Sequence, residues 1–410
     1  MKHPLKIGFV TGEYPPMEGG VGAYTQRLAL ALKEIGHEVH ILTSRRAKPK
    51  IERQRSQSLG EAWQKINDIN EPIEVNGLFI HGRFRRWNWT EMSTIADIAI
   101  RFEFDIVHIQ YQAAAFNMQR VGINYLPWRL KWVLPTVVTF HDLRVPYLFP
   151  KAGPLRNWAV NALGRNADGA IVTNSEDQFA LAERVSTDIE TIPIGSNIPV
   201  KMTNHIEVEE IREKLGLQSD DVLLGYFGFI HPSKGADLLI KALFELSDRF
   251  HLLFIGGQTG SSDPHNTEPF YQELQQMIEG RELEDRVHWS GFISDERVSA
   301  MITASDLFVL PYRDGASLRR GSLMAALAHG KAIITTMPLQ ADSFFKHGSN
   351  VHLIDQANAN ALAQAIKNVS QDSEYRAQLA ANAQSAASQF NWAGIASKTE
   401  ALYQRIHPDG

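Results

Sequence analysis

The 410-residue sequence contains no cysteine. Disulfide bonds, thiolate nucleophiles and zinc sites with cysteine ligands are therefore excluded, and the composition fits a reducing compartment. The sequence also lacks any apolar run near the roughly 18 to 20 residues that span a bilayer, and its first residues, MKHPLKIGFVTG, hold no apolar segment long enough for a signal peptide. These absences predict a cytoplasmic protein.

Two common ligand-binding patterns are missing as well. No His-x3-His, Asp-x-Asp or similar spacing is present, so the sequence predicts no essential metal. The segment TGEYPPMEGGVG at residues 11–22 is rich in glycine, but it does not match GxGxxG. The usual fingerprint of dinucleotide-binding proteins is therefore absent.

The sequence has no strong excess of charge of either sign. The net charge is −5, and 44% of the residues are hydrophobic. Residues 1–200 carry 23 Lys plus Arg against 20 Asp plus Glu, whereas residues 201–410 carry 18 against 26. This balance predicts no nucleic-acid partner, although the more basic first half leaves room for an anionic substrate or a membrane headgroup.

The first half alternates between strand and helix patterns. Leu5–Val10 and Val39–Leu42 are typical of strands, and the apolar spacing from Val21 to Ile35 predicts a helix that ends at a left-handed Gly36. Further short apolar runs lie at 102–111, 135–142, 168–175 and 190–195. Strands joined by crossover helices pair in parallel, so this half predicts a doubly wound α/β domain.

The second half repeats this pattern after a polar connection that includes a short helical segment at Ile211–Leu215. Strands are expected at 221–230, 251–257, 286–293, 306–312, 331–336 and 350–355, and a last helix at Trp392–Ile406. The predicted fold class is α/β with two Rossmann-like domains, at 1–197 and 198–385, followed by a C-terminal helix within 386–410.

Ligands of an open parallel sheet bind at the carboxyl ends of its strands, and three turns at such positions are unusual. In the first, Gly19 and Gly20 precede a helix and allow a ligand to approach backbone N–H groups; a plain turning role is the alternative. In the second, Lys234 precedes Gly235 and a helix N-terminus, which suits phosphate; a solvated surface lysine is the alternative.

The third turn lies within PYRDGASLRRGSLMAALAHG, residues 311–330, whose helix is closed by Gly330. The candidate anion-binding residues of this turn are Ser317, Leu318, Arg319, Arg320, Gly321 and Ser322. Guanidinium groups and helix N–H groups can converge there on one anion. The alternative is that the arginines only pair with Asp314 or with solvent.

Two histidines of the first half belong to predicted strands, His141 at the end of one and His108 inside another. His141, followed by Asp142, stands at a carboxyl end, where it can donate a hydrogen bond or share charge near a transferred group; a structural role is the alternative. His108 has apolar neighbours and is expected to pack or to bond with backbone.

Taken in order, the motifs resemble those of the family 4 retaining glycosyltransferases of the GT-B fold, over nearly the whole chain. The segments are YPPMEGGVGAYTQRLALAL followed by GHEVHILT, FDIVHIQ, TFHD, ADGAIVTNS, TIPIGSNIP, GYFGFIHPSKGADLLIKAL, HLLFIGG, VHWSGFISDERVSAMITASDLFVLPY, AALAHGKAIITT and FNW.

The resemblance implies two facing Rossmann-like domains with the ligand cleft between them. The first would bind the acceptor and the second a nucleoside-diphosphate sugar, and the C-terminal helix would cross back to the first. The sugar would be transferred with retained configuration and without a metal or bound cofactor, because lysine, arginine and helix N-termini offset the charge of the leaving diphosphate. The leaving phosphate itself would deprotonate the acceptor.

The family motifs also imply roles for single residues. Lys234 matches the diphosphate-binding lysine, Gly20 the glycine that closes over the phosphates, and His141 the histidine near the donor sugar. The expected catalytic residues are His141, Lys234 and Arg320. The expected donor-binding residues are Gly19, Gly20, Lys234, Phe292, Ile293, Asp314, Ser317, Leu318, Arg319, Arg320, Gly321 and Ser322, with the base near Phe292 and Ile293.

The sequence lacks the two glutamates that the family usually has in the region 317–325. Where the family usually has Glu-x7-Glu, this chain has Ser317 and Ala325, and Phe229 replaces an arginine that often follows the glycine at 228. Asp314 lies close enough in sequence to substitute for the first acid. A catalytically inactive GT-B protein that acts as a binding or assembly partner is therefore the main alternative; a GT-B epimerase or phosphorylase is a third.

The acceptor class stays open among glycans, glycolipids and small molecules. Trp87, Trp89, Trp128 and Trp132 stand among arginines and a lysine in the basic half. Aromatic residues beside basic groups suit a peripheral membrane contact or a sugar platform, and buried packing is the alternative.

Overall fold

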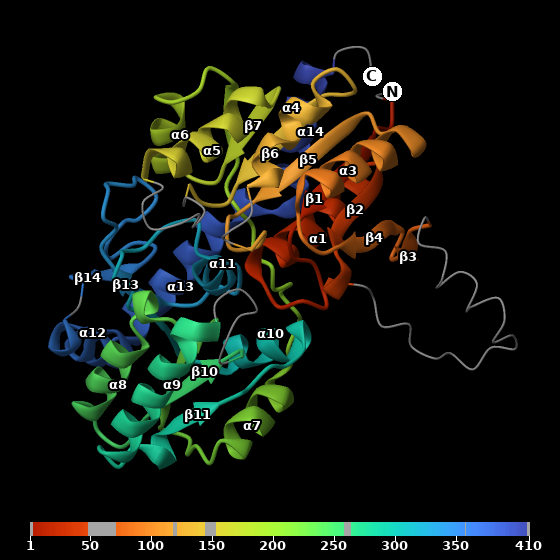
Figure 1. Ribbon diagram of the computed structural model, residues 1–410. Helices are drawn as coiled ribbons and strands as arrows, with labels where there is room; N and C mark the ends of the chain where they lie inside the picture. Colours follow the sequence, from red (N-terminus) through yellow and green to blue (C-terminus); the bar gives the residue numbers. More distant parts are fainter. Residues whose placement is uncertain are drawn as a thin grey trace, which may run out of the picture. The chain divides into compact units, whose positions relative to one another are not determined.

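A computed structural model describes residues 3–47, 71–117, 121–143, 153–257, 264–356 and 358–407. The chain divides into two compact units, which we call the first and the second unit (Figure 1). The first unit comprises Met1–Pro193 and Trp392–Gly410, and the second comprises Ile194–Asn391. Among the described residues, no helix combines the length and apolar character needed to cross a membrane.

The described part of the first unit forms an eight-stranded sheet in the order β3-β4-β2-β1-β5-β6-β7-β8. All neighbours are parallel except β3 and β4. The strands are β1 (Lys6–Thr11), β2 (Glu38–Ser44), β3 (Ile73–Val75), β4 (Leu78–Phe84), β5 (Ile106–Tyr111), β6 (Thr136–Phe140), β7 (Gly169–Val172) and β8 (Asp188–Thr191).

Three of these strands differ from the sequence-based expectation. The hairpin β3–β4, which turns at Asn76 and Gly77 with positive φ at both, was not expected, and its outer strand has only three residues. The strand expected at 190–195 is instead β8, which begins at Asp188 and ends at Thr191. The buried runs of β1, β5 and β6 match their predicted positions, since strands buried on both faces read as continuous apolar runs.

Helices cover this first sheet. They are α1 (Gly20–Glu34), α3 (Trp89–Arg101), α4 (Leu126–Leu130), α5 (Gly153–Asn166), α6 (Ser175–Ala182) and α14 (Trp392–Ile406), with short 3-10 turns η1 (Arg45–Ala47) and η2 (Gly122–Tyr125). Gly36 follows α1 with a φ of 105°, as the left-handed cap predicted. The helices α3 and α6 each begin at an asparagine, Asn88 or Asn174, whose side chain accepts a backbone N–H of the first turn.

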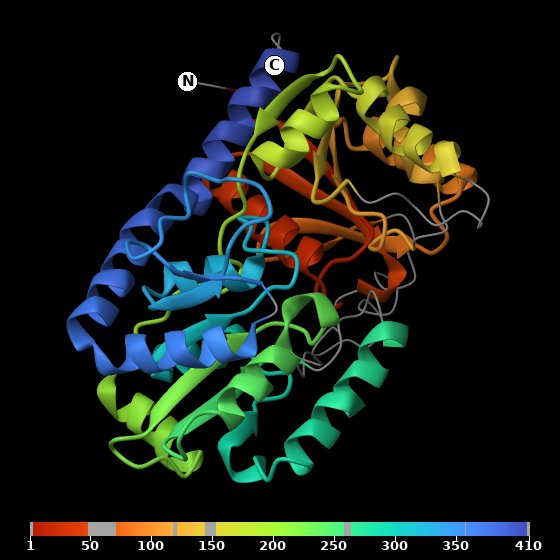
Figure 2. The same cartoon turned by 90° about the vertical axis from the view of Figure 1, so that its left-hand side faces the viewer.

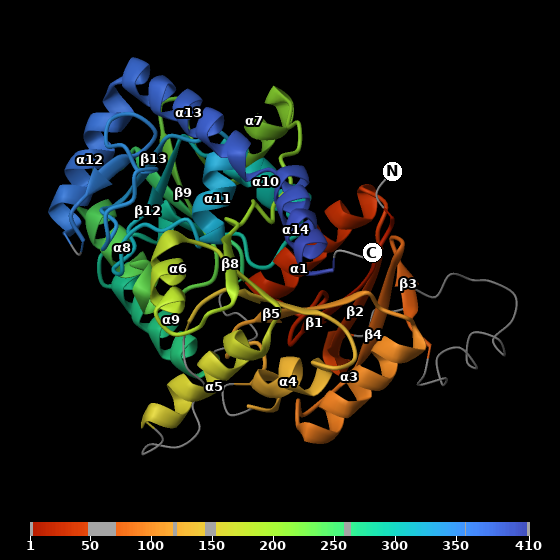
Figure 3. The same ribbon diagram turned by 90° about the horizontal axis from the view of Figure 1, so that it is seen from above.

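The C-terminal helix α14 is part of the first unit's core. It packs beside α1 (Figure 3). The Tyr403 hydroxyl lies 2.6 Å from His108 Nδ1, and a Cβ atom added at Gly169 of β7 would lie 3.3 Å from Leu402. Buried contacts thus hold this helix to strands of the first sheet.

The second unit forms a fully parallel six-stranded sheet in its described part, in the order β11-β10-β9-β12-β13-β14. The strands are β9 (Val222–Phe227), β10 (Phe250–Ile255), β11 (Val287–Trp289), β12 (Leu307–Leu310), β13 (Ile333–Thr336) and β14 (His352–Ile354). Numbered along the chain, this is the order 3-2-1-4-5-6 of the Rossmann fold. The prediction of Rossmann-like α/β domains is therefore confirmed.

Helices lie on both faces of this second sheet (Figure 2). They are α7 (His205–Lys214), α8 (Ala236–Phe244), α9 (Pro264–Glu279), α10 (Asp295–Ala304), α11 (Gly321–Ala328), α12 (Ala359–Gln371) and α13 (Ser373–Ala387), with 3-10 turns η3 (Pro232–Lys234), η4 (Glu284–Arg286) and η5 (Ser388–Phe390). The helix expected at Ile211–Leu215 begins earlier, because the Asn204 side chain caps it by accepting the Glu207 N–H. Gly330 follows α11 at a φ of 60°.

Candidate active site

The strand order of the second sheet reverses between β9 and β12. In doubly wound sheets, ligands bind outside the carboxyl ends of the strands at such a switch point. The segments that follow these two strands, 228–235 and 311–322, contain Lys234 and the arginine turn, two of the predicted anion sites. The fold therefore brings these two separate sequence motifs to one edge of one sheet.

Lys234 depends on glycine at two positions of its loop. Gly228 has a φ of 114°, and a Cβ atom added there would lie 3.0 Å from the Lys234 ammonium nitrogen. Gly235 has a φ of 71°, and its Cβ atom would lie 2.0 Å from the Pro311 carbonyl oxygen. Glycine at 228 thus leaves room for the lysine, and glycine at 235 lets the loop pass the end of the β12 segment.

The Lys234 ammonium group is partly buried and lacks a hydrogen-bond or ion-pair partner among the described residues. Burial is the main cause that lowers its pKa to about 8; nearby Arg320 lowers it further, and Asp314 opposes the shift. A buried amine without a partner is costly in the free protein. Such a group is a strong candidate for binding an anion.

Arg320 stands at the N-cap position of α11. Its guanidinium group forms an ion pair with Asp314 and lies 4.9 Å from the centre of the Tyr312 ring. The pairing with Asp314, which sequence analysis left open as an alternative, is therefore present. Arg320 Nε and Asp314 Oδ1 remain buried without a partner, so both side chains retain hydrogen-bonding capacity. Arg319 is partly exposed and forms no ion pair with any described residue.

The first turn of α11 is open to a ligand. It contains no acidic residue and no side-chain cap, and a Cβ atom added at Gly321 would have no neighbour within 4 Å. Ser322 lies 2.7 Å from the Tyr312 hydroxyl, whereas Ser317 is partly exposed and accepts the Arg320 N–H through its carbonyl oxygen at 3.0 Å. Leu318 lies in the same turn, where it is partly buried. Backbone N–H groups at this helix end favour an anion.

The two positions of the family's acids have different environments. Ala325 is fully buried within α11, and Ser317 lies at the surface of the turn before it. Neither position supplies a carboxylate. The acidic side chain nearest in sequence is that of Asp314, which the ion pair with Arg320 holds in place.

The predicted base-binding segment is connected to the Lys234 loop through backbone. Gly291, directly before Phe292, forms an isolated bridge with Gly256, and a Cβ atom added at Gly256 would lie 3.7 Å from the Gly228 nitrogen. Phe292 is 69% exposed and Ile293 partly exposed. These residues thus lie at the same edge of the sheet as Lys234, with the Phe292 side chain in solvent.

The first unit contains a carboxylate that sequence analysis did not predict. Glu13 is buried, and its Oε1 accepts the N–H groups of Val21 at 3.0 Å and Gly22 at 3.3 Å. A Cβ atom added at Gly19 would lie 2.1 Å from that oxygen. Burial raises the pKa of Glu13, and the two N–H groups oppose the shift.

Glu13 changes the interpretation of the glycine turn. Two N–H groups at the start of α1 are bound by a side chain of the same unit, and Gly19 provides the space for that carboxylate. Gly20 has open space where a Cβ atom would be, so it is the glycine of this pair that leaves room for a ligand. The sequence signal that could have predicted this carboxylate is the acid in TGE, residues 11–13, which follows the first strand.

His141 lies after β6 in the first unit and is half-buried. Its Nε2 lies 2.9 Å from Gln110 Oε1, and its ring meets the edge of the Tyr24 ring at 4.7 Å. Burial lowers the pKa of His141 to about 3, so the ring is neutral at pH 7 and acts through hydrogen bonds rather than charge. His108 is fully buried between the hydroxyl groups of Tyr403 and Thr139, at 2.6 and 2.7 Å, which is a structural role.

One of the predicted surface tryptophans is a core residue. Trp87 is 4% exposed and packs against Phe84 and Phe116. Trp89, Trp128 and Trp132 are exposed, as the surface interpretation requires. In the part of the chain that the structure describes, no group of three or more His, Cys, Asp or Glu residues is placed to hold a metal ion.

Comparisons with known proteins agree with this architecture. A family model of glycosyl transferases group 1 matches residues 207–386, and a model of Glycosyltransferase Family 4 matches residues 18–198. The two models together cover most of the chain, one in each half.

Individual relatives are distant. The alpha-monoglucosyldiacylglycerol synthase of Streptococcus pneumoniae is 24% identical over 318 residues, which are 74% of this chain and 65% of that protein, slightly less than two thirds of its length. The D-inositol 3-phosphate glycosyltransferase of Corynebacterium glutamicum is 24% identical over 94% of this chain and 91% of that protein. The solved structure of Anabaena HepE in complex with UDP has a TM-score of 0.71 at 20% identity and covers 98% of this chain and 100% of that one. From the two family models and the shared fold, this chain belongs to the family 4 glycosyltransferases and has the GT-B fold.

Proposed function

We propose that this glycosyltransferase moves a sugar from a nucleoside-diphosphate sugar to a hydroxyl acceptor, with retained configuration and without a metal. The observation that carries the proposal is the Lys234 ammonium group at the switch point of the second sheet. It has no partner among the described residues, and it lies close to Arg320 and the uncapped start of α11. The Anabaena relative was solved with UDP bound, so UDP is the first nucleotide to test.

The charges at this edge suit a leaving diphosphate. Lys234 and Arg320 supply two positive charges, and the N–H groups of α11 add a partial one. Together they offset the negative charge that develops as the sugar–phosphate bond breaks, which is the role that a divalent cation has in metal-dependent transferases. The acceptor proton passes to the leaving phosphate, so no protein nucleophile is required.

Asp314 replaces the first missing acid in this proposal. Its Oδ2 pairs with Arg320, and its Oδ1 is buried without a partner. That free oxygen accepts a hydroxyl of the donor sugar. Neutral His141 carries one N–H, at Nε2, which donates to Gln110 Oε1, so its Nδ1 accepts a hydroxyl of the sugar. With Ala325 at the second position, the ribose is bound without a carboxylate.

Thermal unfolding with UDP, GDP or ADP and their sugar conjugates, in the presence of a chelator, tests the donor site. A ligand at about 100 times its dissociation constant stabilises the fold by roughly 2.7 kcal/mol, which is a readily measured shift. We expect one nucleotide class to stabilise the wild type and to have no effect on Lys234→Ala. Two results would contradict the proposal: stabilisation that requires added metal, and the absence of stabilisation by every nucleotide tested.

Product analysis separates the enzyme from the inactive alternative. Incubation with the stabilising sugar nucleotide and an acceptor panel, followed by NMR of the product, gives both transfer and anomeric configuration. An α-linked donor should yield an α-linked product. Nucleotide binding with no hydrolysis and no transfer to any acceptor would favour the binding partner instead.

We propose a lipid-linked acceptor for this transfer, reached at a membrane surface. Exposed tryptophans gather on the elements α3, α4 and α5 and on the turn after α4: Trp89, Trp128, Trp132 and Trp158, at 56%, 58%, 91% and 51% exposure. Tyr125 links two of them, with ring centres 5.2 Å from Trp89 and 5.6 Å from Trp158, and Lys131 lies 5.7 Å from the Trp132 ring. Exposed aromatic rings beside basic groups are typical of interfacial binding.

Sedimentation with vesicles of anionic and of neutral lipid tests this contact. We expect the wild type to bind anionic vesicles and Trp128→Ala/Trp132→Ala to lose most of that binding, while Phe179→Ala, which removes an exposed aromatic residue from α6, retains it. Equal sedimentation of all three proteins would contradict the proposed membrane contact and favour a soluble acceptor.

A further inference from the structure

The second unit contains a pocket of about 510 Å³ that the donor site does not use. Four charged residues of its lining stand just before strands: Asp221 before β9, Arg249 before β10, Asp306 before β12 and Lys331 before β13. Because these strands are parallel, their amino ends share one edge of the sheet. The pocket therefore lies at the edge opposite the one that holds Lys234 and Arg320.

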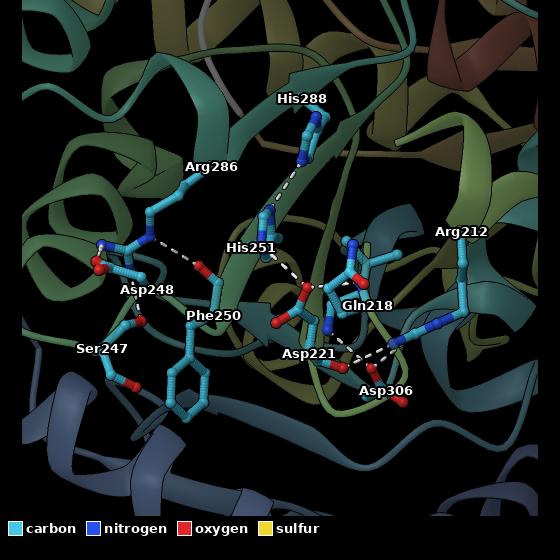
Figure 4. Close-up of polar contacts among 11 residues, drawn as sticks. Arg212, Gln218, Asp221, Ser247, Asp248, Phe250, His251, Arg286, His288 and Asp306 are labelled. Carbon is cyan, nitrogen blue, oxygen red and sulfur yellow. Dashed lines mark hydrogen bonds and ion pairs between the residues drawn. The ribbon is translucent and has the colours of Figure 1, made fainter. Parts of the chain in front are cut away.

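Two acidic side chains of the lining, Asp306 and Asp221, already have partners (Figure 4), whereas the third acid, Asp220, is exposed. Asp306 Oδ2 accepts from Arg212 Nη1 at 2.9 Å and from the Leu223 N–H at 2.7 Å. Asp221 Oδ2 accepts the Gln218 N–H at 2.7 Å and lies 3.6 Å from His251 Nε2. Arg212 thus offsets the charge of Asp306, and the Gln218 N–H and His251 are the partners of Asp221.

Three cationic side chains of the lining have no such compensation. Lys331 Nζ donates to the Thr303 carbonyl oxygen at 3.1 Å, Arg376 Nη1 donates to that of Ser370 at 2.7 Å, and Arg249 lies 5.6 Å from the Phe250 ring. None of the three forms an ion pair with a carboxylate in the described ranges of the chain.

Lys331 is partly buried among charges of both signs. Burial is the main cause that lowers its pKa to about 8; Asp306 opposes the shift, and Arg212 and Arg376 add to it. The carbonyl contacts hold the Lys331 and Arg376 side chains in place but do not neutralise them. A bound anion would give these cations a charged partner, as Arg212 does for Asp306 in Figure 4.

We propose that this pocket binds the phosphate group of a small molecule, either free phosphate or a phosphorylated sugar, through Lys331, Arg376 and Arg249. Cavities of roughly 300 to 1,000 Å³ hold small ligands, and several lining cations without an ion-pair partner among the described residues suit a dianion better than a single carboxylate. The site is separate from the nucleotide site and does not depend on the transfer reaction.

Calorimetric titration of the full-length Lys234→Ala variant with inorganic phosphate and with glucose 6-phosphate tests the site, because this variant lacks the main cation of the donor edge. We expect binding to persist there. Adding Lys331→Gln or Arg376→Gln should weaken it about tenfold or more, as expected for the loss of a charge-assisted contact. Lys214→Gln is the matched control: this lysine is an exposed cation on the same helix as Arg212 and does not line the pocket.

Arg249→Gln keeps the test independent of folding, because this side chain is exposed. Tighter binding of glucose 6-phosphate than of phosphate would support a phosphorylated sugar as the ligand, and equal binding would support free phosphate. The proposal is overturned if neither ligand binds Lys234→Ala, or if the Lys331, Arg376 and Arg249 variants bind as tightly as the Lys214 control.

Discussion

At the scale of single residues, Lys234 combines burial with a positive charge, and its pKa of about 8 predicts that the proposed nucleotide binding depends on pH. The pKa of an unfolded lysine is about 10.4, so the charged form is the one that folding penalises. The free energy of unfolding therefore rises with pH between about 8 and 10.4, as the folded protein releases this proton first. Diphosphate binding requires the charged form and changes in the opposite direction.

We expect the association constant for the stabilising nucleotide to be nearly constant at and below pH 7 to 7.5 and to fall above about pH 8, by up to tenfold per pH unit. Calorimetry between about pH 7 and 9 measures this. Lys234→Met should bind weakly with no such pH dependence, whereas Lys331→Gln should keep the wild-type profile. A profile unchanged by Lys234→Met would assign the titration to another group.

Gly235 offers a second prediction at this scale. An alanine at this position combines a positive φ with a Cβ atom 2.0 Å from the Pro311 carbonyl oxygen. We expect Gly235→Ala to lower the free energy of unfolding by about 2 to 4 kcal/mol, since the backbone of the β12 loop must move. Urea unfolding of the second unit, compared between the wild type and Gly235→Ala, measures this loss of stability.

Gly216 is the matched control in the same unit. Its φ of 74° is close to the 71° of Gly235, but a Cβ atom there would have no neighbour within 4 Å. Gly216→Ala should lower the free energy of unfolding by only about 1 kcal/mol, because only the left-handed backbone disfavours alanine there. Equal losses for the two variants would show that the contact with Pro311 relaxes freely.

At the scale of elements, α14 is a core helix of the first unit. Leu402 is fully buried and contacts β7, whereas Lys398 of the same helix is exposed. We expect Leu402→Ala to destabilise the first unit by about 2 to 5 kcal/mol and Lys398→Ala to change its stability by less than about 0.5 kcal/mol. Hydrogen exchange of the β7 amides, followed in increasing urea, measures both. A small effect of Leu402→Ala would mean that α14 is dispensable to the sheet.

At the scale of the whole molecule, the two units differ in how the chain builds them. Ile194–Asn391 is one continuous segment with its own core cluster, and it contains Lys234, Arg320 and the amino-edge pocket. The first unit requires two segments distant in sequence.

We therefore expect a fragment of residues 194–391 to fold and to bind the nucleotide within about tenfold of the full chain, with the same dependence on Lys234. A fragment of residues 1–193 lacks α14 and should not unfold cooperatively. Circular dichroism and calorimetry of the two fragments measure this. Cooperative unfolding of 1–193 alone would contradict the assignment of α14 to its core.

Local patterns were enough for the architecture and the family. Apolar runs, helical spacing and the glycines at 36 and 330 are short-range signals, and they predicted the strands that are buried on both faces and the helices between them. The motif order likewise identified the family, and the turns around Lys234 and Arg320, predicted separately as anion sites, lie at one edge of the second sheet. The strand β3 was not predicted because three residues carry little periodic signal, and the seven-residue β4 was not predicted either.

The sequence by itself thus determined the fold class and the family, and it predicted the cations of the proposed donor site, because each is encoded in contiguous residues. Tertiary structure alone decided how those residues are partnered. It paired Arg320 with Asp314, placed Glu13 on the N–H groups of α1 and buried Trp87. It also joined His108 to Tyr403, 295 positions away, and collected charges from four strand starts into one pocket. Such contacts depend on which strands are neighbours in the sheet, and no local pattern records that order.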